Sequence, residues 1–298
     1  FKKITSFEFM ESSKENPTNF TRKRKLPFVD MILFILGGIN KSLAVQLSEF
    51  FTLAGKSDQT VSKQAFSKSR MQIRYEALIE LNDTLVHEYY SMEHKLYKGY
   101  RLLSVDGSII ELPQGEEIRR VFGSKNNNPS NSNCGQSICF YDVLNEIIVY
   151  SKLAKYGEDE RSLLKVGAKR LIKDGKQMKD IIIADRGFPS LGVIFELAQN
   201  GFDFVIRYTG EHFLKETMYF AKSDDRDAVV VIDLKEIRKR SKWSKYIALN
   251  REFKGKTVKL RIVKIDLGGG KTEFLMTTLL DKEEISLEEL KEIYGLRW

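Results

Sequence analysis

Residues 180–188 read Asp-Ile-Ile-Ile-Ala-Asp-Arg-Gly-Phe, and they are the starting point for predicting the fold. Residues 180–184 are a compact run rich in isoleucine, which is typical of a strand buried on both faces of a sheet. Residues 160–172 before the strand and 189–200 after it have helical patterns, and Pro189 and Gly201 suit the start and the end of the second helix. A buried strand between two helices predicts an α/β sheet that helices cover.

The strands that complete this sheet are expected on both sides of residues 180–184. They are predicted at residues 101–105, 137–143, 146–153, 202–206 and 272–279, with a hairpin turn at Leu144-Asn145. Residues 208–270 are strand-rich and basic, with expected strands at 228–232 and 256–265, so they predict a β-rich insertion. Ser286 begins the last helix, where Ser286 and Glu289 have the spacing of a capping box. The order predicts an α/β mixed sheet flanked by helices.

The N-terminal region is expected to be entirely helical. Helices are predicted at residues 28–39, 42–51 and 62–73. The last two could form a helix-turn-helix, although residues 52–60 are a longer connector than the usual turn of about 3–4 residues. The basic cluster at residues 22–25 is equally well read as a solvated loop or as a contact for phosphate groups. We expect one domain at residues 1–97 and a second at 98–298.

The bulk composition excludes several classes of protein. No apolar run is long enough to cross a bilayer, and the longest candidate, residues 28–39, contains Asp30. Cys134 and Cys139 have no partners for a zinc site, so two reduced thiols in a reducing compartment are expected. The net charge of +8 favours a polyanionic partner such as nucleic acid, which is a weak indication by itself. Because the chain begins with Phe1 and stops inside an expected helix, we expect a fragment of a longer protein.

Two carboxylates are the candidate chemical groups. Asp106 and Asp185 are each expected directly after a buried strand, and glycine follows closely in both cases. A strand end holds its side chain rigidly, and a nearby glycine lets the backbone turn away from what the carboxylate binds. Two carboxylates on neighbouring strand ends offer hard oxygen ligands that suit Mg²⁺ or Mn²⁺. Two such ions can activate a water or a 3′-hydroxyl and stabilise the leaving oxygen of a phosphodiester.

Simpler interpretations remain for these and other motifs. Either Asp-Gly pattern alone is more often a turn than a site. Residues 268–272, Gly-Gly-Gly-Lys-Thr, end like a phosphate-binding loop, but Ile265 stands where its first glycine belongs. A hairpin turn between two strands is the better interpretation of that segment. The acidic run at residues 158–160 is expected to begin a helix, where negative charge is favourable.

The last helix adds a motif that links the two carboxylates to a family. Tyr294 and Arg297 are three residues apart and therefore share a helix face. With this spacing the sequence resembles the DDE transposases of bacterial insertion sequences, in the branch named after insertion sequence 4. The signature of that branch is Tyr, two residues, Arg, three residues, Glu, six residues, Lys. Tyr294 and Arg297 match it, Trp298 is a common companion of the Arg, and the Glu would fall at position 301, past the last residue.

The resemblance covers nearly all of residues 103–298. The first Asp of the family lies in a block like Val-Asp-Gly-Ser followed by Leu-Pro, which residues 105–108 and 112–113 match. Its second Asp lies in a block like Asp-Arg-Gly-Phe, which residues 185–188 match, and a strand ending in Arg follows, as at residues 204–207. The resemblance implies a ribonuclease-H-like catalytic domain at residues 98–298, with the insertion at about 208–270, behind a DNA-binding region at 1–97.

The resemblance also implies roles for individual residues. Asp106 and Asp185 would be catalytic and would bind the metal, two ions of Mg²⁺ or Mn²⁺. The residues expected to contact DNA are Arg207, Tyr294, Arg297, Arg186 and Trp243. For Trp243, which could stack on an extruded base, ordinary packing is the simpler expectation. Arg186 is either a phosphate contact or a solvated charge.

The activity that the resemblance implies is cut-and-paste DNA transposition. Metal-dependent cleavage at transposon ends would precede strand transfer into target DNA. The implied partners are transposon-end and target DNA and a second copy of the chain in a homodimeric synaptic complex, on DNA in the bacterial cytoplasm and not at a membrane. Two alternatives remain: a metal-dependent nuclease without strand transfer, and a non-catalytic DNA-binding protein descended from a transposase. A chain without the Glu and the Lys is expected to be inactive alone.

Overall fold

The computed structural model describes residues 1–22, 24–38, 40–59, 61–128, 132–173, 178–209, 215–236, 252–253 and 256–297. The chain divides into two compact units, Phe1–Met92 and Glu93–Trp298. Each unit has its own buried apolar clusters. We therefore describe the two units separately.

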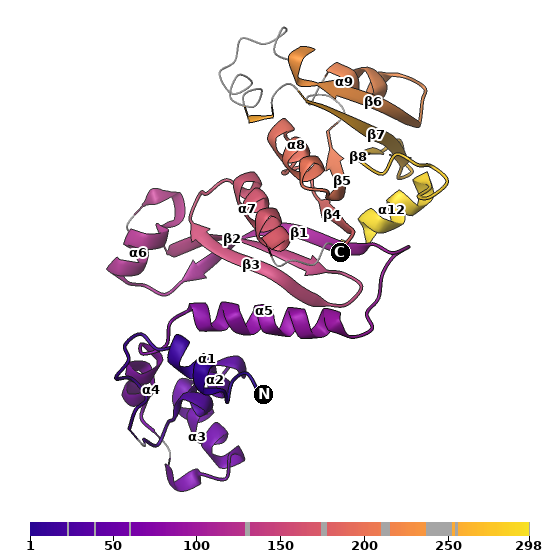
Figure 1. Cartoon of the computed structure of the whole chain (residues 1–298). Helices are drawn as coiled ribbons and strands as arrows, with labels where there is room; N and C mark the ends of the chain where they lie inside the picture. The colour runs from indigo at the N-terminus through magenta and orange to yellow at the C-terminus, as the bar shows by residue number, and fades with distance from the viewer. Residues whose placement is uncertain are drawn as a thin grey trace. The chain divides into compact units, whose positions relative to one another are not determined.

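The first unit is built from short helices, as expected (Figure 1). The described helices are α1 (Phe7–Ser12), α2 (Phe28–Leu36), α3 (Leu43–Leu53), the 3-10 helix η1 (Ser57–Gln59), α4 (Lys63–Arg70) and α5 (Glu76–Ser91). The helix expected at residues 28–39 ends at Leu36, because Gly37 caps it and Gly38 takes a positive φ of 70°. Buried phenylalanines from α2, α3 and α4 form one of its two cores.

The second unit contains one eight-stranded sheet, ordered β3-β2-β1-β4-β5-β8-β7-β6. The strands are β1 (Arg101–Leu112), β2 (Asn133–Asp142), β3 (Ile147–Lys155), β4 (Asp180–Ala184), β5 (Asp203–Tyr208), β6 (Asp227–Asp233), β7 (Thr257–Asp266) and β8 (Thr272–Thr277). The β1–β4 and β4–β5 pairs are parallel, and every other pair is antiparallel. The predicted mixed α/β sheet flanked by helices is confirmed. Strands β6 and β7 extend the same sheet through β8.

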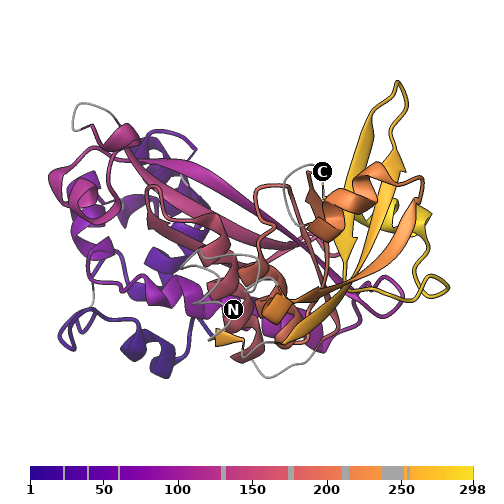
Figure 2. The same cartoon turned by 90° about the horizontal axis from the view of Figure 1, so that it is seen from above.

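Helices cover both faces of this sheet (Figures 1 and 2). They are α6 (Glu116–Phe122), the 3-10 helix η2 (Lys125–Asn127), α7 (Glu160–Lys173), α8 (Leu191–Gln199), α9 (Lys215–Lys222) and α12 (Leu287–Gly295). Helix α7 packs on β2 and β3, where Gly167 lies against the ring of Phe140. Helix α12 packs on the other face. Its Ile293 and Tyr294 share a core with Ile183 of β4, and successive residues of a strand point to opposite faces of the sheet.

Several local predictions are confirmed and one is corrected. The turn at residues 268–270 joins antiparallel β7 to β8, and all three glycines have positive φ. Ser286 and Glu289 form the predicted capping box of α12. Helix α8 begins at Leu191, because the hydroxyl of Ser190 caps it, so Pro189 precedes the cap and is not in the first turn. Among the described residues, no helix is both long and apolar enough to cross a membrane.

Candidate functional site

Asp106 lies within a strand, which corrects the expectation that it follows one. Strand β1 continues past Asp106 to Leu112, because β2 keeps pairing with it and places Cys139 opposite Asp106. The parallel neighbour β4 stops earlier, at the pair Val105–Ala184. Asp106 is therefore the first residue of β1 without a partner on the β4 side, and its side chain is 59% exposed.

Asp185 comes directly after β4, as predicted. The register of the parallel pair sets Ala184 beside Val105, so Asp185 and Asp106 are the next residues on two neighbouring strands. A tight turn follows, in which the backbone N–H of Phe188 donates to the carbonyl of Asp185 at 3.0 Å. The two carboxylates thus occupy the same edge of the sheet, where ligands collect in open α/β sheets.

One guanidinium lies between the two carboxylates. Nη2 of Arg297 is 3.3 Å from Oδ1 of Asp106, and Nη1 of Arg297 is 3.5 Å from Oδ2 of Asp185. The Arg297 side chain is only 3% exposed and that of Asp185 25%, so water screens this ion pair less than the pair with the exposed Asp106. Arg297 follows α12, which the buried Ile293 and Tyr294 hold against the sheet.

Arg207 and Tyr294 also meet Asp185. Nε and Nη2 of Arg207 each lie 2.7 Å from Oδ1 of Asp185, and the Tyr294 hydroxyl lies 3.3 Å from the same oxygen. The guanidinium of Arg207 stands over the Tyr294 ring at 5.9 Å. Three of the residues predicted to contact DNA are thus brought together with the two predicted metal ligands.

The surrounding charges set the ionisation of Asp185. Burial raises the pKa of its carboxyl, but the backbone N–H of Arg186 at 2.6 Å and the charges of Arg207 and Arg297 outweigh burial. The pKa of Asp185 is therefore lower than usual, and the group is ionised at neutral pH. Burial and the Asp185 charge raise the pKa of the Tyr294 hydroxyl to about 12, against the opposing effect of the two arginines. Tyr294 is accordingly a neutral hydrogen-bond donor.

The other two residues predicted to contact DNA are not part of this cluster. The exposed side chain of Arg186 makes no hydrogen bond or ion pair with any residue that the structure describes, and only its backbone N–H contacts Asp185. Trp243 falls at residues 237–251, outside the described residues. Neither prediction is tested by the structure.

The structure adds Glu160, which the sequence suggested only as a helix start. An added Cβ at Gly107 would lie 2.2 Å from Oε1 of Glu160, so the carboxylate approaches the strand closely, directly after Asp106. The Gln136 amide donates to the same oxygen at 2.9 Å. Burial first, and then the charges of Asp106 and Asp159, raise the pKa of Glu160. The glycine after Asp106 was the one sequence signal for a close approach here.

Glu273 is the second acidic residue that the sequence did not indicate. It lies on β8, and its Oε2 is 3.0 Å from Nη1 of Arg207. Arg207 therefore joins Asp185 to Glu273. Glu273 is distant in sequence from the other site residues, and the β5–β8 pairing that brings it near carries no motif.

The site offers hard oxygen ligands to a divalent cation. Nη2 and Nη1 of Arg297 contact Asp106 and Asp185 respectively, so the two carboxylates lie beside the same positive group. No group of three or more His, Cys, Asp or Glu side chains able to hold a metal occurs within the described ranges. The two carboxylates fit the chemistry of Mg²⁺ or Mn²⁺ as a partial ligand set.

Three comparisons with known proteins bear on the family of this chain. The family described as "Transposase DDE domain" matches residues 97–298. A comparison with curated proteins finds no match. Among solved structures, the chain is similar to one described as "Cryo-EM structure of piggyBac transposase synaptic complex with hairpin DNA (SNHP)", at 12% identity and a TM-score of 0.48. That match covers 99% of this chain and 64% of the other, so the chain spans under two thirds of that protein's length.

Proposed function

This chain belongs to the transposase DDE domain family, and from that membership we propose that it cuts DNA at transposon ends and joins the cut ends to target DNA. The observation that carries the proposal is the convergence of Asp106 and Asp185 on the guanidinium of Arg297. Two strand-borne carboxylates on neighbouring strands, beside two arginines, supply part of what metal-dependent phosphodiester chemistry uses.

In this proposal Asp106 and Asp185 hold the divalent metal, Mg²⁺ or Mn²⁺, with two ions in the active form. The metal would supply activation of the attacking water or 3′-hydroxyl and stabilisation of the leaving oxygen. Arg207 and Arg297 orient the DNA, because both guanidiniums lie within hydrogen-bond reach of the carboxylates and can contact a phosphate held there. Tyr294, as a neutral donor, contributes one further bond to that phosphate, and Arg186 contacts the backbone beside it.

The remaining features of the proposal extend beyond the described residues. Trp243 is proposed to stack on an extruded base. The active assembly is proposed to be a homodimer on transposon ends and target DNA, in the bacterial cytoplasm.

Cleavage of the element's own DNA tests this function. The full-length protein is incubated with Mg²⁺ and a linear DNA that carries both ends of the element. We expect cutting at the ends, and we expect Asp106→Asn and Asp185→Asn each to lower it at least about 100-fold, as loss of a group that acts on the transition state does. Asp225→Asn is the matched control, because Asp225 is an exposed carboxylate of the same unit and should cut normally. Unchanged cutting by both site variants would contradict the metal-site assignment.

The products separate the transposase from its alternatives. We expect the released 3′-ends to become joined to a second, unlabelled DNA in the same reaction. Cut ends that never join would indicate a nuclease without strand transfer. Binding of the ends without any cutting, by wild type and by both variants alike, would indicate a DNA-binding protein that has lost catalysis.

A further inference from the structure

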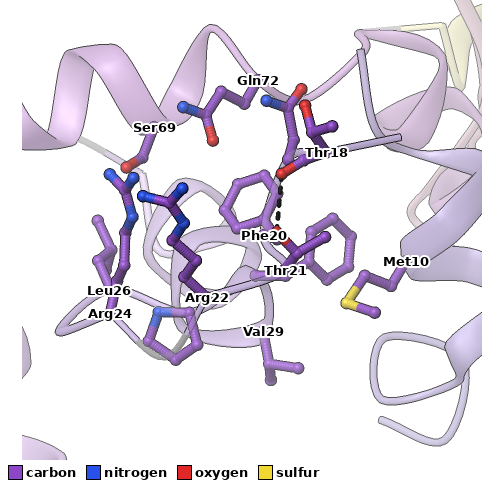
Figure 3. Close-up of a pocket in the computed structure, with 13 residues that line it drawn as sticks. Met10, Thr18, Phe20, Thr21, Arg22, Arg24, Leu26, Val29, Ser69 and Gln72 are labelled. Carbon is purple, nitrogen blue, oxygen red and sulfur yellow. Dashed lines mark hydrogen bonds between the residues drawn. The ribbon is translucent and has the colours of Figure 1, made fainter. Parts of the chain in front are cut away.

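The first unit contains a cavity of about 860 Å³ that the proposed reaction does not use. It lies between the segment at residues 18–29 and the end of α4, where Ser69 and Gln72 face it (Figure 3). The cavity is large enough for more than one ring-sized group. Its lining combines hydroxyl and amide groups, two arginines and an aromatic floor, and each part indicates one portion of a ligand.

The rim of the cavity is cationic. Arg22 and Arg24 both line it, and Figure 3 shows their side chains directed toward the side that carries Ser69 and Gln72. Both arginines are exposed, and neither forms an ion pair with any residue the structure describes. By contrast, Lys41 and Lys56 in the same unit are paired with Glu49 and Asp30. Uncompensated guanidiniums beside a cavity favour an anionic ligand, and a planar phosphate contact suits arginine best.

The floor of the cavity is aromatic and fixed. Phe20 takes a positive φ of 55°, which is an unusual conformation for a bulky residue. The surrounding packing maintains it, because the Phe20 ring meets the buried Phe28 ring edge-on at 5.5 Å. Phe28 in turn contacts Phe9 at 5.7 Å. Phe20 is only half-buried and lines the cavity, so part of this residue is accessible there.

We propose that this cavity binds single-stranded DNA, with the phosphodiester on Arg22 and Arg24 and an unpaired base on the ring of Phe20. A cationic rim alone would suit any polyanion. The neighbouring aromatic ring and the amide of Gln72 add the surfaces that an unstacked base uses, for stacking and for hydrogen bonding at its edge. The inference rests on the proposed function in one respect, that DNA is the polyanion this chain meets.

Binding of a fluorescein-labelled single strand of 20 nucleotides of mixed sequence to the full-length protein tests the proposal. The double change Arg22→Gln/Arg24→Gln should weaken binding at least about tenfold. It should also make the fall of log affinity with log salt concentration less steep by about 1.4, which corresponds to two lost phosphate contacts. Phe20→Leu, which keeps an apolar side chain but removes the ring, should weaken binding roughly 5- to 150-fold, the range measured for loss of one stacked base.

Two controls make the result decisive. Lys2→Gln/Lys41→Gln removes two exposed charges of the same unit away from the cavity and should change binding much less. A fully paired duplex should be insensitive to Phe20→Leu, because its bases are not free to stack on the ring. The proposal would be overturned if the Arg22/Arg24 variant bound the single strand as tightly as the Lys2/Lys41 variant. It would also be overturned if Phe20→Leu weakened binding of the duplex and of the single strand equally. If wild type cuts its ends normally while these variants bind normally, this inference alone fails.

Discussion

Arg297 links the two carboxylates that the register of β1 and β4 brings together. Its guanidinium contacts Asp106 on one side and Asp185 on the other, and Arg207 adds a second positive group at Asp185. Two carboxylates at one sheet edge would otherwise repel each other. The two arginines offset that repulsion, and with the backbone N–H of Arg186 they lower the pKa of the Asp185 carboxyl.

Sequence motifs indicated those residues of the candidate site that lie in a distinctive block and missed those that only a non-local contact brings near. Asp185 and Tyr294 could be found because each lies in a distinctive block of sequence. Glu273 could not, since it reaches Arg207 only through the pairing of β5 with β8. Glu160 had the appearance of an ordinary acidic helix start, and only the close approach of its carboxylate to Gly107 sets it apart.

The contact between Gly107 and Glu160 gives a prediction at this scale. In Gly107→Ala the new Cβ would occupy the position of the Glu160 carboxylate, which must then leave its 2.9 Å bond with Gln136. We expect a loss of about 1 kcal/mol in the free energy of unfolding, the value of one such bond. In the double variant Gly107→Ala/Glu160→Ala, the loss in the free energy of unfolding should be smaller than the sum of the losses in the two single variants. Urea unfolding measures all three losses. Strictly additive costs would contradict the contact.

At the scale of elements, local patterns predicted which segments are strands but not which strands pair. The apolar run at Asp180–Ala184 was predicted with its final bounds, because burial on both faces is visible in sequence. The end of β1 was predicted seven residues early, at Val105 instead of Leu112. The Asp-Gly pair resembles a turn, and the β2 pairing that carries β1 onward depends on residues 133–142, which local sequence cannot foresee.

The β6–β7 pair contains a buried ion pair that can be tested. The Arg261 side chain is 0% exposed, and its Nη2 and Nε lie 2.8 Å and 3.0 Å from the oxygens of Asp227. Asp227→Asn would leave a buried guanidinium without its counter-charge, so we expect a loss of about 3–5 kcal/mol in the free energy of unfolding. Asp224→Asn, an exposed change close in sequence, should cost under about 0.5 kcal/mol.

The same pair predicts a dependence on pH. Burial raises the pKa of Asp227, but its bonds to Arg261 and Lys282 outweigh burial and lower it. A lowered pKa in the folded state means that the stabilisation is complete above the unfolded value of about 3.9 and is lost as the pH falls through the folded value. The difference between wild type and Asp227→Asn should therefore be constant near neutral pH and shrink in acid. A difference that grows in acid would contradict the ion pair.

At the scale of the whole molecule, the candidate site belongs to one compact unit, and the other unit is helical and has its own apolar clusters. The sheet edge with Asp106 and Asp185 belongs to the second unit, and the cavity beside Arg22 belongs to the first. Buried phenylalanines fill the first unit, including Phe9, Phe34 and Phe66. A unit with its own apolar core is able to fold without the rest of the chain.

Residues 1–92 are accordingly expected to fold alone. The isolated segment should show a helical circular dichroism spectrum and a cooperative thermal transition, because its clusters are formed only by its own residues. Phe34→Ala, which empties a core position that is 2% exposed, should abolish or sharply lower that transition, since such truncations cost about 3–5 kcal/mol. A gradual, non-cooperative loss of helix in the unchanged segment would show that the division into units is wrong.

The most direct test of the site is a titration of the full-length protein with Mn²⁺. Electron paramagnetic resonance measures the concentration of free Mn²⁺ at each step. Asp106 and Asp185 contact one guanidinium from neighbouring strands, so we predict that wild type binds Mn²⁺ and that Asp106→Asn and Asp185→Asn each weaken binding at least about tenfold. Asp225→Asn should bind as wild type does. Equal Mn²⁺ affinity in all four proteins would contradict the claim that these two carboxylates form one metal site.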